Sequence, residues 1–227
     1  MGKGVRKQFL LLDGQPILAH TLRRFEEVPE VCEIIPVVPA EELEDCLEKC
    51  VESMGLKKVR RLVPGGAHRQ DSVYNGLKAV EPGTDFILVH DGVRPFVTVE
   101  LIQELIRSLV DCDGAILAVP AKDTLKEVTK DQIVKKTLDR GLCYQVQTPQ
   151  AFRYQVLKDA FASAYADGFY GTDESMLVER RGGWIKVVTG SYMNIKITTP
   201  EDMILAEALF RKEASDMKPN TGRTRTP

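Results

Sequence analysis

Three residues that can do chemistry follow one apolar run of the chain within five positions. The run covers residues 86–89, and His90, Asp91 and Arg94 come directly after it. A carboxylate, an imidazole and a guanidinium at one point can hold a divalent metal and a phosphate together. The same residues also fit an Asp91-Gly92 turn with Arg94 in a surface ion pair, so this stretch alone favours neither interpretation.

The elements around this stretch decide what it can reach. An unbroken apolar run that ends in a turn predicts a strand buried on both faces. In open α/β sheets, ligands bind beyond the carboxyl ends of such strands. We therefore expect a second loop at the same edge, in which Gly65-Gly66, Arg69 and Ser72 precede a helix over residues 73–80. Its free backbone N–H groups can cradle a nucleotide base or its phosphates, although a glycine turn with an ordinary N-cap fits too.

Length and composition limit the class of protein. The 227 residues suffice for one sizeable α/β core, and a net charge of −2 gives no global attraction to nucleic acid or to an anionic membrane. Five cysteines without a C-x-x-C pair favour free thiols in a reducing compartment. We find no signal-peptide pattern and no apolar run of membrane-span length, so we expect a cytoplasmic protein.

Strand and helix patterns alternate along most of the chain. Strands are expected over residues 9–12, 32–39, 57–63, 86–89, 114–119 and 184–188, and at 194–198 before a helix that starts at Pro200. Helices are expected over residues 17–27, 41–54, 73–80, 98–111 and 153–166, and after Asp173. This order predicts one Rossmann-like three-layer α/β/α domain over residues 1–217, with a mostly parallel sheet. Residues 218–227 are polar, lack periodicity and are expected to form a disordered tail.

One segment does not follow this alternation of strands and helices. Residues 121–140 alternate polar and apolar side chains across a turn at 129–132, which predicts a two-stranded hairpin. A hairpin with little core of its own is marginal in water. We therefore expect the protruding arm, residues 121–147, to pack on a partner.

Scattered cations suggest the kind of reaction. Most of them lie on loops or at element ends: Lys7, Arg69, Arg94, Arg140 and Lys196. Such a cluster, with one well-placed acid, suits phosphoryl or nucleotidyl transfer, in which positioning and charge neutralisation dominate. A Walker A sequence, a G-x-S-x-G elbow and a Cys/His pair are all missing from the sequence, which disfavours P-loop kinases and covalent hydrolases.

Several motifs in consistent order resemble one family. They are Lys7-Gln8-Phe9, Gly65-Gly66-x-x-Arg69-x-x-Ser72-Val73, Val89-His90-Asp91-x-x-Arg94-Pro95, Lys122-Asp123-Thr124-x-Lys126, Thr148-Pro149-Gln150-x-Phe152, Thr172-Asp173-Glu174 and Asn194-Ile195-Lys196-x-Thr198-x-Pro200-Glu201-Asp202. Together they span nearly the whole chain and resemble the 2-C-methyl-D-erythritol 4-phosphate cytidylyltransferases of the non-mevalonate isoprenoid pathway. The resemblance implies a nucleotidyltransferase that forms CDP-methylerythritol and pyrophosphate from CTP and methylerythritol phosphate with Mg²⁺.

The resemblance also implies roles for particular residues. Lys7 matches the lysine that stabilises charge on the triphosphate, and Arg140 and Lys196 match the pair that positions the sugar phosphate. Gly66, Ala67 and Ser72 match the turn that recognises cytosine, with Arg69 as a further CTP-binding residue. The residues that match the surroundings of the second substrate are Asp91, Arg94, Thr124 and Thr148. Asp91 is the candidate Mg²⁺ ligand, with orientation of a sugar hydroxyl as its alternative role.

The resemblance further implies a homodimer in which the arm crosses to the second subunit, so that Arg140 serves the partner's site. The chain departs from the family at its start, where Met1-Gly2 matches the end of a glycine-rich motif. The first strand and the phosphate loop of the family are therefore expected to be missing. Two other functions stay open: a cytidylyltransferase acting on ribitol 5-phosphate, and a catalytically inactive nucleotide-binding dimer.

Overall fold

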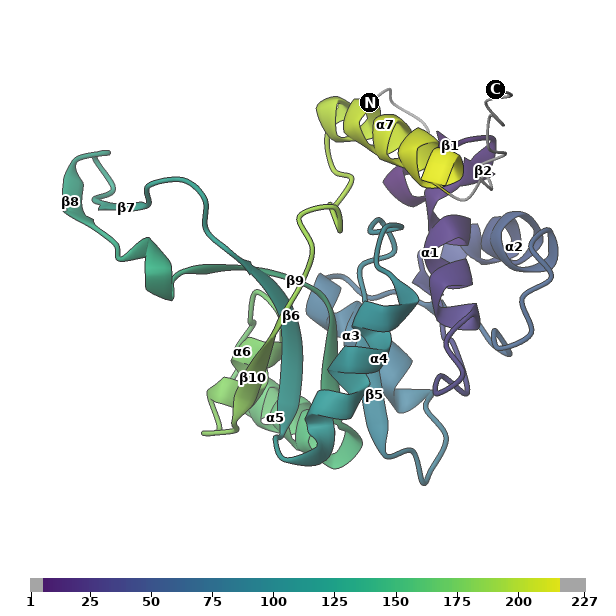
Figure 1. Ribbon diagram of the computed structural model, residues 1–227. Coiled ribbons are helices and arrows are strands. Elements are labelled where there is room, and N and C mark those ends of the chain that lie inside the picture. The colour runs from purple at the N-terminus through teal and green to yellow at the C-terminus, as the bar shows by residue number, and fades with distance from the viewer. Residues whose placement is uncertain (1–5, 217–227) are drawn as a thin grey trace, which may run out of the picture.

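Four strands form the central sheet of the computed structural model, which describes residues 6–216 (Figure 1). Their order is β10 (Ile185–Thr189), β6 (Gly114–Pro120), β9 (Tyr144–Arg153) and β5 (Phe86–Val89). β6 and β10 run parallel, whereas β9 runs antiparallel to both β6 and β5. Three strands thus share one direction, but the inserted β9 makes the sheet mixed, and the prediction of a mostly parallel sheet is corrected accordingly.

β9 is a strand that the sequence pattern did not indicate. Its centre holds Pro149 among polar residues, a combination that argues against a central strand. Residues 147–152 are nevertheless all buried between β5 and β6. Their polar side chains find partners there, since Gln147 donates a hydrogen bond to the Ser191 carbonyl at 2.7 Å and Gln150 donates one to Asp173 at 2.8 Å.

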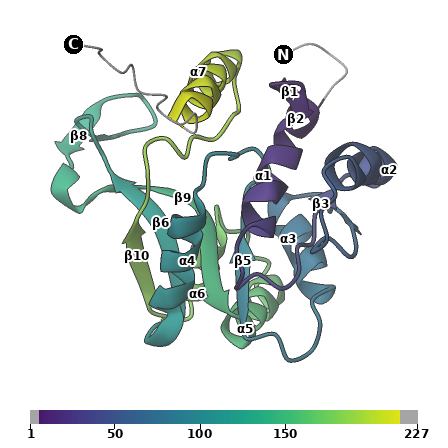
Figure 2. The same cartoon turned by 45° about the vertical axis from the view of Figure 1, so that its right-hand side comes forward.

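Helices cover both faces of this sheet (Figures 1 and 2). On one face, α4 (Val99–Arg107) and the end of α1 (Ile17–Glu26) pack through an apolar cluster that includes Phe25, Ile102, Leu105, Leu117 and Val188. On the other, α3 (Arg69–Lys78), α5 (Tyr154–Ala166) and α6 (Glu174–Glu179) share a cluster with Leu77, Phe152, Leu157, Phe161 and Leu177. The α/β/α prediction is confirmed.

The last helix closes one end of the molecule. α7 (Pro200–Asp216) packs against a short hairpin of β1 (Leu11–Leu12) and β2 (Gln15–Pro16). A cluster of Leu12, Ile17, Phe96, Ile197, Ala206 and Leu209 joins them. The strand expected over residues 9–12 is thus reduced to two residues after a 3₁₀ turn at Lys7–Phe9, and residues 194–198 form an irregular segment rather than a strand.

A second, two-stranded sheet lies beyond the central one. β3 (Val37–Val38) and β4 (Val63–Pro64) run parallel, so the strands expected over 32–39 and 57–63 shrink to these pairs and one Ile34–Val59 bridge. The helix expected over 41–54 divides into a 3₁₀ turn (Ala40–Glu42), α2 (Leu43–Cys46) and a π-helical segment (Leu47–Glu52). The element types were therefore largely right, but their lengths were too long.

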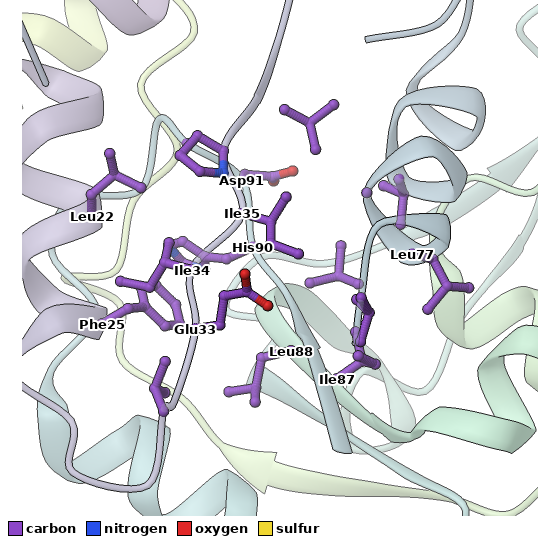
Figure 3. Close-up of a pocket in the computed structure, with 18 of the residues that line it drawn as sticks. Leu22, Phe25, Glu33, Ile34, Ile35, Leu77, Ile87, Leu88, His90 and Asp91 are labelled. Atoms are coloured by element: carbon purple, nitrogen blue, oxygen red, sulfur yellow. The ribbon is translucent and has the colours of Figure 1, made fainter. Parts of the chain in front are cut away.

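A groove of about 820 Å³ separates β3 from β5. Figure 3 shows apolar side chains of both sides around it, among them Ile34, Ile35, Ile87 and Leu88. Because β5 is paired only with β9 within residues 6–216, its other edge faces this groove. The expectation that β5 is buried on both faces is met in part: Leu88 packs into the apolar cluster on one face and Ile87 and Val89 into the cluster on the other, but Phe86 at its start is 37% exposed.

Backbone polar groups of both strands point into the groove. The Tyr154 N–H donates to the Asp85 carbonyl at 2.9 Å, so by alternation the N–H and C=O groups of Phe86 and Leu88 point away from β9. Across the groove, the Pro36 and Val38 carbonyls face β4, which turns the polar groups of Val37 toward β5.

The predicted arm is present as a hairpin. β7 (Lys126–Val128) and β8 (Val134–Thr137) pair antiparallel and stand clear of the body of the molecule (Figure 1). The expected tail at 218–227 and the Met1-Gly2 motif lie outside the described residues. Among residues 6–216, the helices are all too short or too polar to cross a membrane.

Candidate active site

Asp91 gathers three cations around one carboxylate. The Lys196 Nζ lies 2.9 Å from its Oδ2, the Arg94 Nε lies 3.5 Å from the same oxygen, and the Arg69 Nε lies 3.4 Å from Oδ1. Burial by itself raises the pKa of Asp91, but the charges of Lys196, Arg69 and Arg94 outweigh it and hold this pKa below its usual value. Asp91 is therefore ionised at neutral pH.

The topology explains why these side chains meet. Asp91 follows the carboxyl end of β5, Lys196 lies in the segment after β10, and Arg69 begins α3 in the segment after β4. β5 and β10 point the same way, so their following loops emerge at one edge of the sheet. The structure thus brings Asp91, Arg94, Arg69 and Lys196 together.

Two hydroxyl groups fix the loop that carries Asp91. The Thr148 hydroxyl on β9 accepts a hydrogen bond from the Asp91 N–H at 3.0 Å. From α1, the buried Thr21 hydroxyl donates to the Gly92 carbonyl at 3.0 Å. Thr148, predicted to lie near the second substrate, is thus at the site but is buried, and it acts on the backbone of Asp91.

Arg94 joins this loop to the one that carries Lys196. Its Nη1 donates to the Asn194 carbonyl at 2.8 Å, and its side chain is only 12% exposed. The fully buried Asn194 side chain in turn donates to the Thr148 carbonyl at 2.9 Å. These contacts hold the segment before Lys196 against β9, so Arg94 has a positioning role in this geometry.

Arg69 bridges two acids. Its Nη1 and Nη2 bind the Glu174 carboxylate at 2.7 and 3.0 Å, while its Nε faces Asp91. Burial lowers the pKa of Arg69, but the charges of Glu174 and Asp91 reverse this and raise it above the ordinary value. Burial raises the pKa of Glu174, against the opposing effect of Arg69.

The glycine turn predicted to recognise CTP begins beside Arg69. The Ser72 hydroxyl accepts from the Gly66 N–H at 3.0 Å and donates to the His68 carbonyl at 3.1 Å. A Cβ atom on Gly66 would lie 2.4 Å from the Cβ of Asp71, so a larger residue there would displace the turn. Ala67 is exposed at the tip of this turn.

His90 does not join the site as a ligand. Its ring is buried against Phe25, with ring centroids 4.9 Å apart, and its Nε2 lies 3.0 Å from the Arg94 carbonyl. Burial lowers the pKa of His90 to about 4, so the imidazole is neutral at pH 7. Figure 3 shows it beside Asp91 at the wall of the groove.

Three predicted site residues do not reach the Asp91 cluster. Lys7 is exposed in its 3₁₀ turn, and its neighbour Gln8, rather than Lys7, lines the groove. Thr124 and Arg140 lie on the arm, where the Arg140 Nη1 donates to the Lys122 carbonyl at 2.9 Å. The arm stands away from the body of its own chain (Figure 1), so these two residues lie outside the site that this chain forms by itself.

The surroundings of Asp91 do not fit a resident Mg²⁺ ion. Both carboxylate oxygens already face cations, and three positive charges near one acid repel a divalent cation. Within the part of the chain that the structure describes, three His, Cys, Asp or Glu side chains nowhere gather closely enough to hold a metal. The proposed direct contact between Asp91 and the metal therefore has no supporting donor set.

Sequence reasoning missed three residues that organise the site. Glu174, Asn194 and Gln150 were noted within the family motifs but were given no role. All three are polar and essentially fully buried. The signal that could have found them is the position of a polar residue within an apolar or strand-like segment, because buried polar groups need partners.

Comparisons with known proteins agree on one family. The family model described as IspD, 2-C-methyl-D-erythritol 4-phosphate cytidylyltransferase, matches residues 1–212. A protein of that name from Geobacter metallireducens is 52% identical over 217 residues, which cover 94% of this chain and 93% of the relative. One from Geotalea uraniireducens is 48% identical over 218 residues, which cover 95% of this chain and 93% of the relative.

Solved structures are similar as well. The 4-diphosphocytidyl-2C-methyl-D-erythritol synthase of Anaerococcus prevotii superposes with a TM-score of 0.84 at 36% identity, covering 92% of each chain. The 2-C-methyl-D-erythritol 4-phosphate cytidylyltransferase of Thermus thermophilus gives a TM-score of 0.75 at 30% identity, covering 92% of this chain and 95% of that one. The fold class expected from the sequence is that of these enzymes.

Proposed function

This chain belongs to the 2-C-methyl-D-erythritol 4-phosphate cytidylyltransferase family, and we propose that its Asp91 site joins CTP to methylerythritol phosphate. It is a nucleotidyltransferase of isoprenoid precursor biosynthesis. A phosphate oxygen of the sugar phosphate attacks the α-phosphorus of CTP. The new P–O bond forms as the bond to the β-phosphate breaks, and pyrophosphate leaves with both electrons of that bond. The step needs no covalent enzyme intermediate.

One observation carries the assignment of the site: three cations lie within 3.5 Å of one mostly buried acid. With Glu174, the cluster holds two acids and three bases, so its net charge is about +1. A local positive charge on an otherwise slightly acidic protein attracts phosphates to this place. Lys196 and Arg69 have 41% and 39% of their side chains exposed, so these two cations can contact an incoming phosphate, whereas Arg94 is mostly buried.

The glycine turn is proposed as the CTP subsite. Gly66 and Ala67 present backbone to solvent beside Arg69, and the N-terminus of α3 adds partial positive charge. Ser72 holds the turn through its hydroxyl group. In this arrangement, Arg69 and Asp91 lie between the nucleotide subsite and the sugar-phosphate subsite.

We propose that the complete site takes Thr124 and Arg140 from a second copy of the chain. The arm, residues 121–147, carries exposed apolar side chains, and its hairpin before β9 packs little against its own body (Figure 1). A homodimer in which each arm reaches the other subunit would cover that surface and add a cation to each site. Lys7 is assigned to the triphosphate on the family resemblance.

A divalent cation is proposed to arrive with CTP rather than to reside on the protein. Mg²⁺ commonly binds through substrate phosphates with few protein ligands. Bound to the triphosphate, it supplies neutralisation of phosphate charge. The roles of the chain are then to orient the two phosphates and to place Lys196 and the arginines around them.

A cytoplasmic location is proposed on two grounds. All five cysteines are free thiols, as is typical of a reducing compartment. The substrates are small phosphorylated metabolites of the cell interior. Residues 1–217 are proposed as one cytidylyltransferase domain.

The test is pyrophosphate release with CTP and each sugar phosphate in turn. We expect release with methylerythritol 4-phosphate to exceed that with ribitol 5-phosphate by at least about tenfold in kcat/KM, the reverse order being the mark of a ribitol-5-phosphate enzyme. Calorimetry with CTP and Mg²⁺ provides the second arm. Binding of CTP without any release would overturn the proposal in favour of an inactive nucleotide-binding dimer.

A further inference from the structure

Glu174 is a fully buried acid without an assigned role in the reaction. It is the first residue of α6, and its side chain is 1% exposed. Burying a carboxylate costs several kcal/mol unless it is well paired. Its side-chain partner among the described residues is Arg69, which donates a hydrogen bond to each of the two carboxylate oxygens.

The helix does not need Glu174 for its own start. The Asp173 carboxylate caps α6 by accepting from the Met176 N–H at 3.0 Å. The Gln150 side chain accepts from the Ser175 N–H at 3.1 Å and donates to Asp173. β9 therefore clamps the beginning of α6, which leaves the Glu174 carboxylate fixed and directed at Arg69.

Arg69 is the more exposed member of the pair. Its side chain is 39% exposed, and its Nε faces Asp91 while its outer nitrogens face Glu174. A planar guanidinium that binds both oxygens of a carboxylate is fixed in orientation as well as in position. Without Glu174, the nearest acid is Asp91, where Arg69 would compete with Lys196 for the carboxylate.

We propose that Glu174 is a positioning residue that holds Arg69 at the boundary of the two subsites and keeps Asp91 available to Lys196. This inference rests on the proposed function, because it assigns Arg69 to the CTP subsite. It differs from a purely structural ion pair in one respect: the effect of Glu174 on catalysis passes through Arg69 alone.

A double-mutant cycle tests this path. Glu174→Gln keeps the shape and removes the charge, and we expect kcat/KM for CTP to fall about tenfold, mainly through KM. In an Arg69→Gln background, the same Glu174→Gln change is expected to have an effect of less than about twofold. Equal losses in both backgrounds would overturn the proposal.

Two further variants keep the result interpretable. Glu179→Gln on the exposed end of the same helix is the matched control, and its kinetics are expected to equal those of the wild type. If Glu174→Gln does not fold, Glu174→Asp retains the charge and is expected to keep more CTP affinity than the Arg69→Gln protein. Failure of Glu174→Asp to exceed it would contradict the positioning role.

The wild type separates this inference from the proposed function. Its pyrophosphate release tests the function, whereas the cycle can also be measured as the dissociation constant of CTP by calorimetry. Coupling of Glu174 and Arg69 in CTP binding without release would uphold the positioning role and overturn only the reaction. Pyrophosphate release together with additive effects of the two substitutions would uphold the reaction and overturn the positioning role of Glu174.

Discussion

The Lys196 Nζ lies 2.9 Å from the Asp91 Oδ2, which joins the loops that follow β5 and β10. The two residues are far apart in sequence and meet because both strands end at one edge of the sheet. Asp91 is held by Thr148 through its backbone, whereas Lys196 is partly exposed. The acid is therefore the fixed member of the pair, and the lysine can turn toward a phosphate.

Lys196→Ala should lower turnover by about 100-fold or more while leaving the fold intact, because it removes a cation that stabilises phosphate charge. Steady-state kinetics and a thermal melt measure the two effects. Lys186→Ala on β10, which removes an exposed lysine paired with Asp111 at 3.8 Å, is the matched control. Unchanged kinetics for Lys196→Ala would contradict the assignment of the site.

Mixing two inactive variants should restore activity if the arm serves the partner's site. In a mixed dimer of Arg140→Ala and Lys196→Ala chains, one site carries both substitutions and the other carries neither. Random exchange of subunits then leaves about a quarter of all sites intact, by counting over a twofold dimer. Turnover of the mixture measures this fraction, with each variant alone as the control. An inactive mixture of exchanged subunits would place Arg140 in its own chain's site, whereas full activity of the Arg140→Ala chain alone would place Arg140 outside the reaction.

The stability of the folded chain should fall as the pH drops from about 6.5 toward 4, because His90 is buried in its neutral form. His90 has a pKa of about 4 in the folded chain because of its burial, against about 6.5 when unfolded. As the pH falls, His90 is therefore protonated in the unfolded chain before it is protonated in the folded chain. The contribution of neutral His90 to the free energy of unfolding is complete above pH 6.5 and is lost progressively toward pH 4. The loss amounts to about 3 kcal/mol.

Urea unfolding at several pH values measures this loss. His90→Phe keeps the ring packing near Phe25 and removes the titrating group. The difference in unfolding free energy between wild type and variant should change with pH over this window. A difference that stays constant from pH 7 to pH 4.5 would show that His90 is not the group responsible.

Backbone amides along β5 should exchange hydrogen at alternating rates. The Ile87 and Val89 amides face β9, whereas the Leu88 amide points into the groove. We expect Leu88 to exchange at least about tenfold faster than its two neighbours, since its N–H lacks a strand partner among the described residues. Exchange measured by NMR compares the three residues within one strand. Equal protection would mean that the groove edge of β5 is paired.

The fold class followed from local patterns, but β9 did not. Alternating strand and helix signals identified the α/β/α layers, because apolar periodicity reports which face of an element is buried. The buried polar residues of β9 gave no such signal, since their hydrogen-bond partners come from distant segments. The antiparallel strand, and with it the mixed sheet, could therefore not be predicted from periodicity.

The candidate site, like the fold, was predictable from the sequence only in part. The chemical groups available to the site follow from the order of strands and loops along the chain, which already places Asp91, Arg94, Arg69 and Lys196 at strand ends. How these groups act depends on tertiary contacts: Arg94 and Thr148 hold loops, Glu174 binds Arg69, and Arg140 lies out on the arm. Charge pairing and burial depend on distances between segments remote in sequence, and these distances exist only once the sheet has brought its strand ends together.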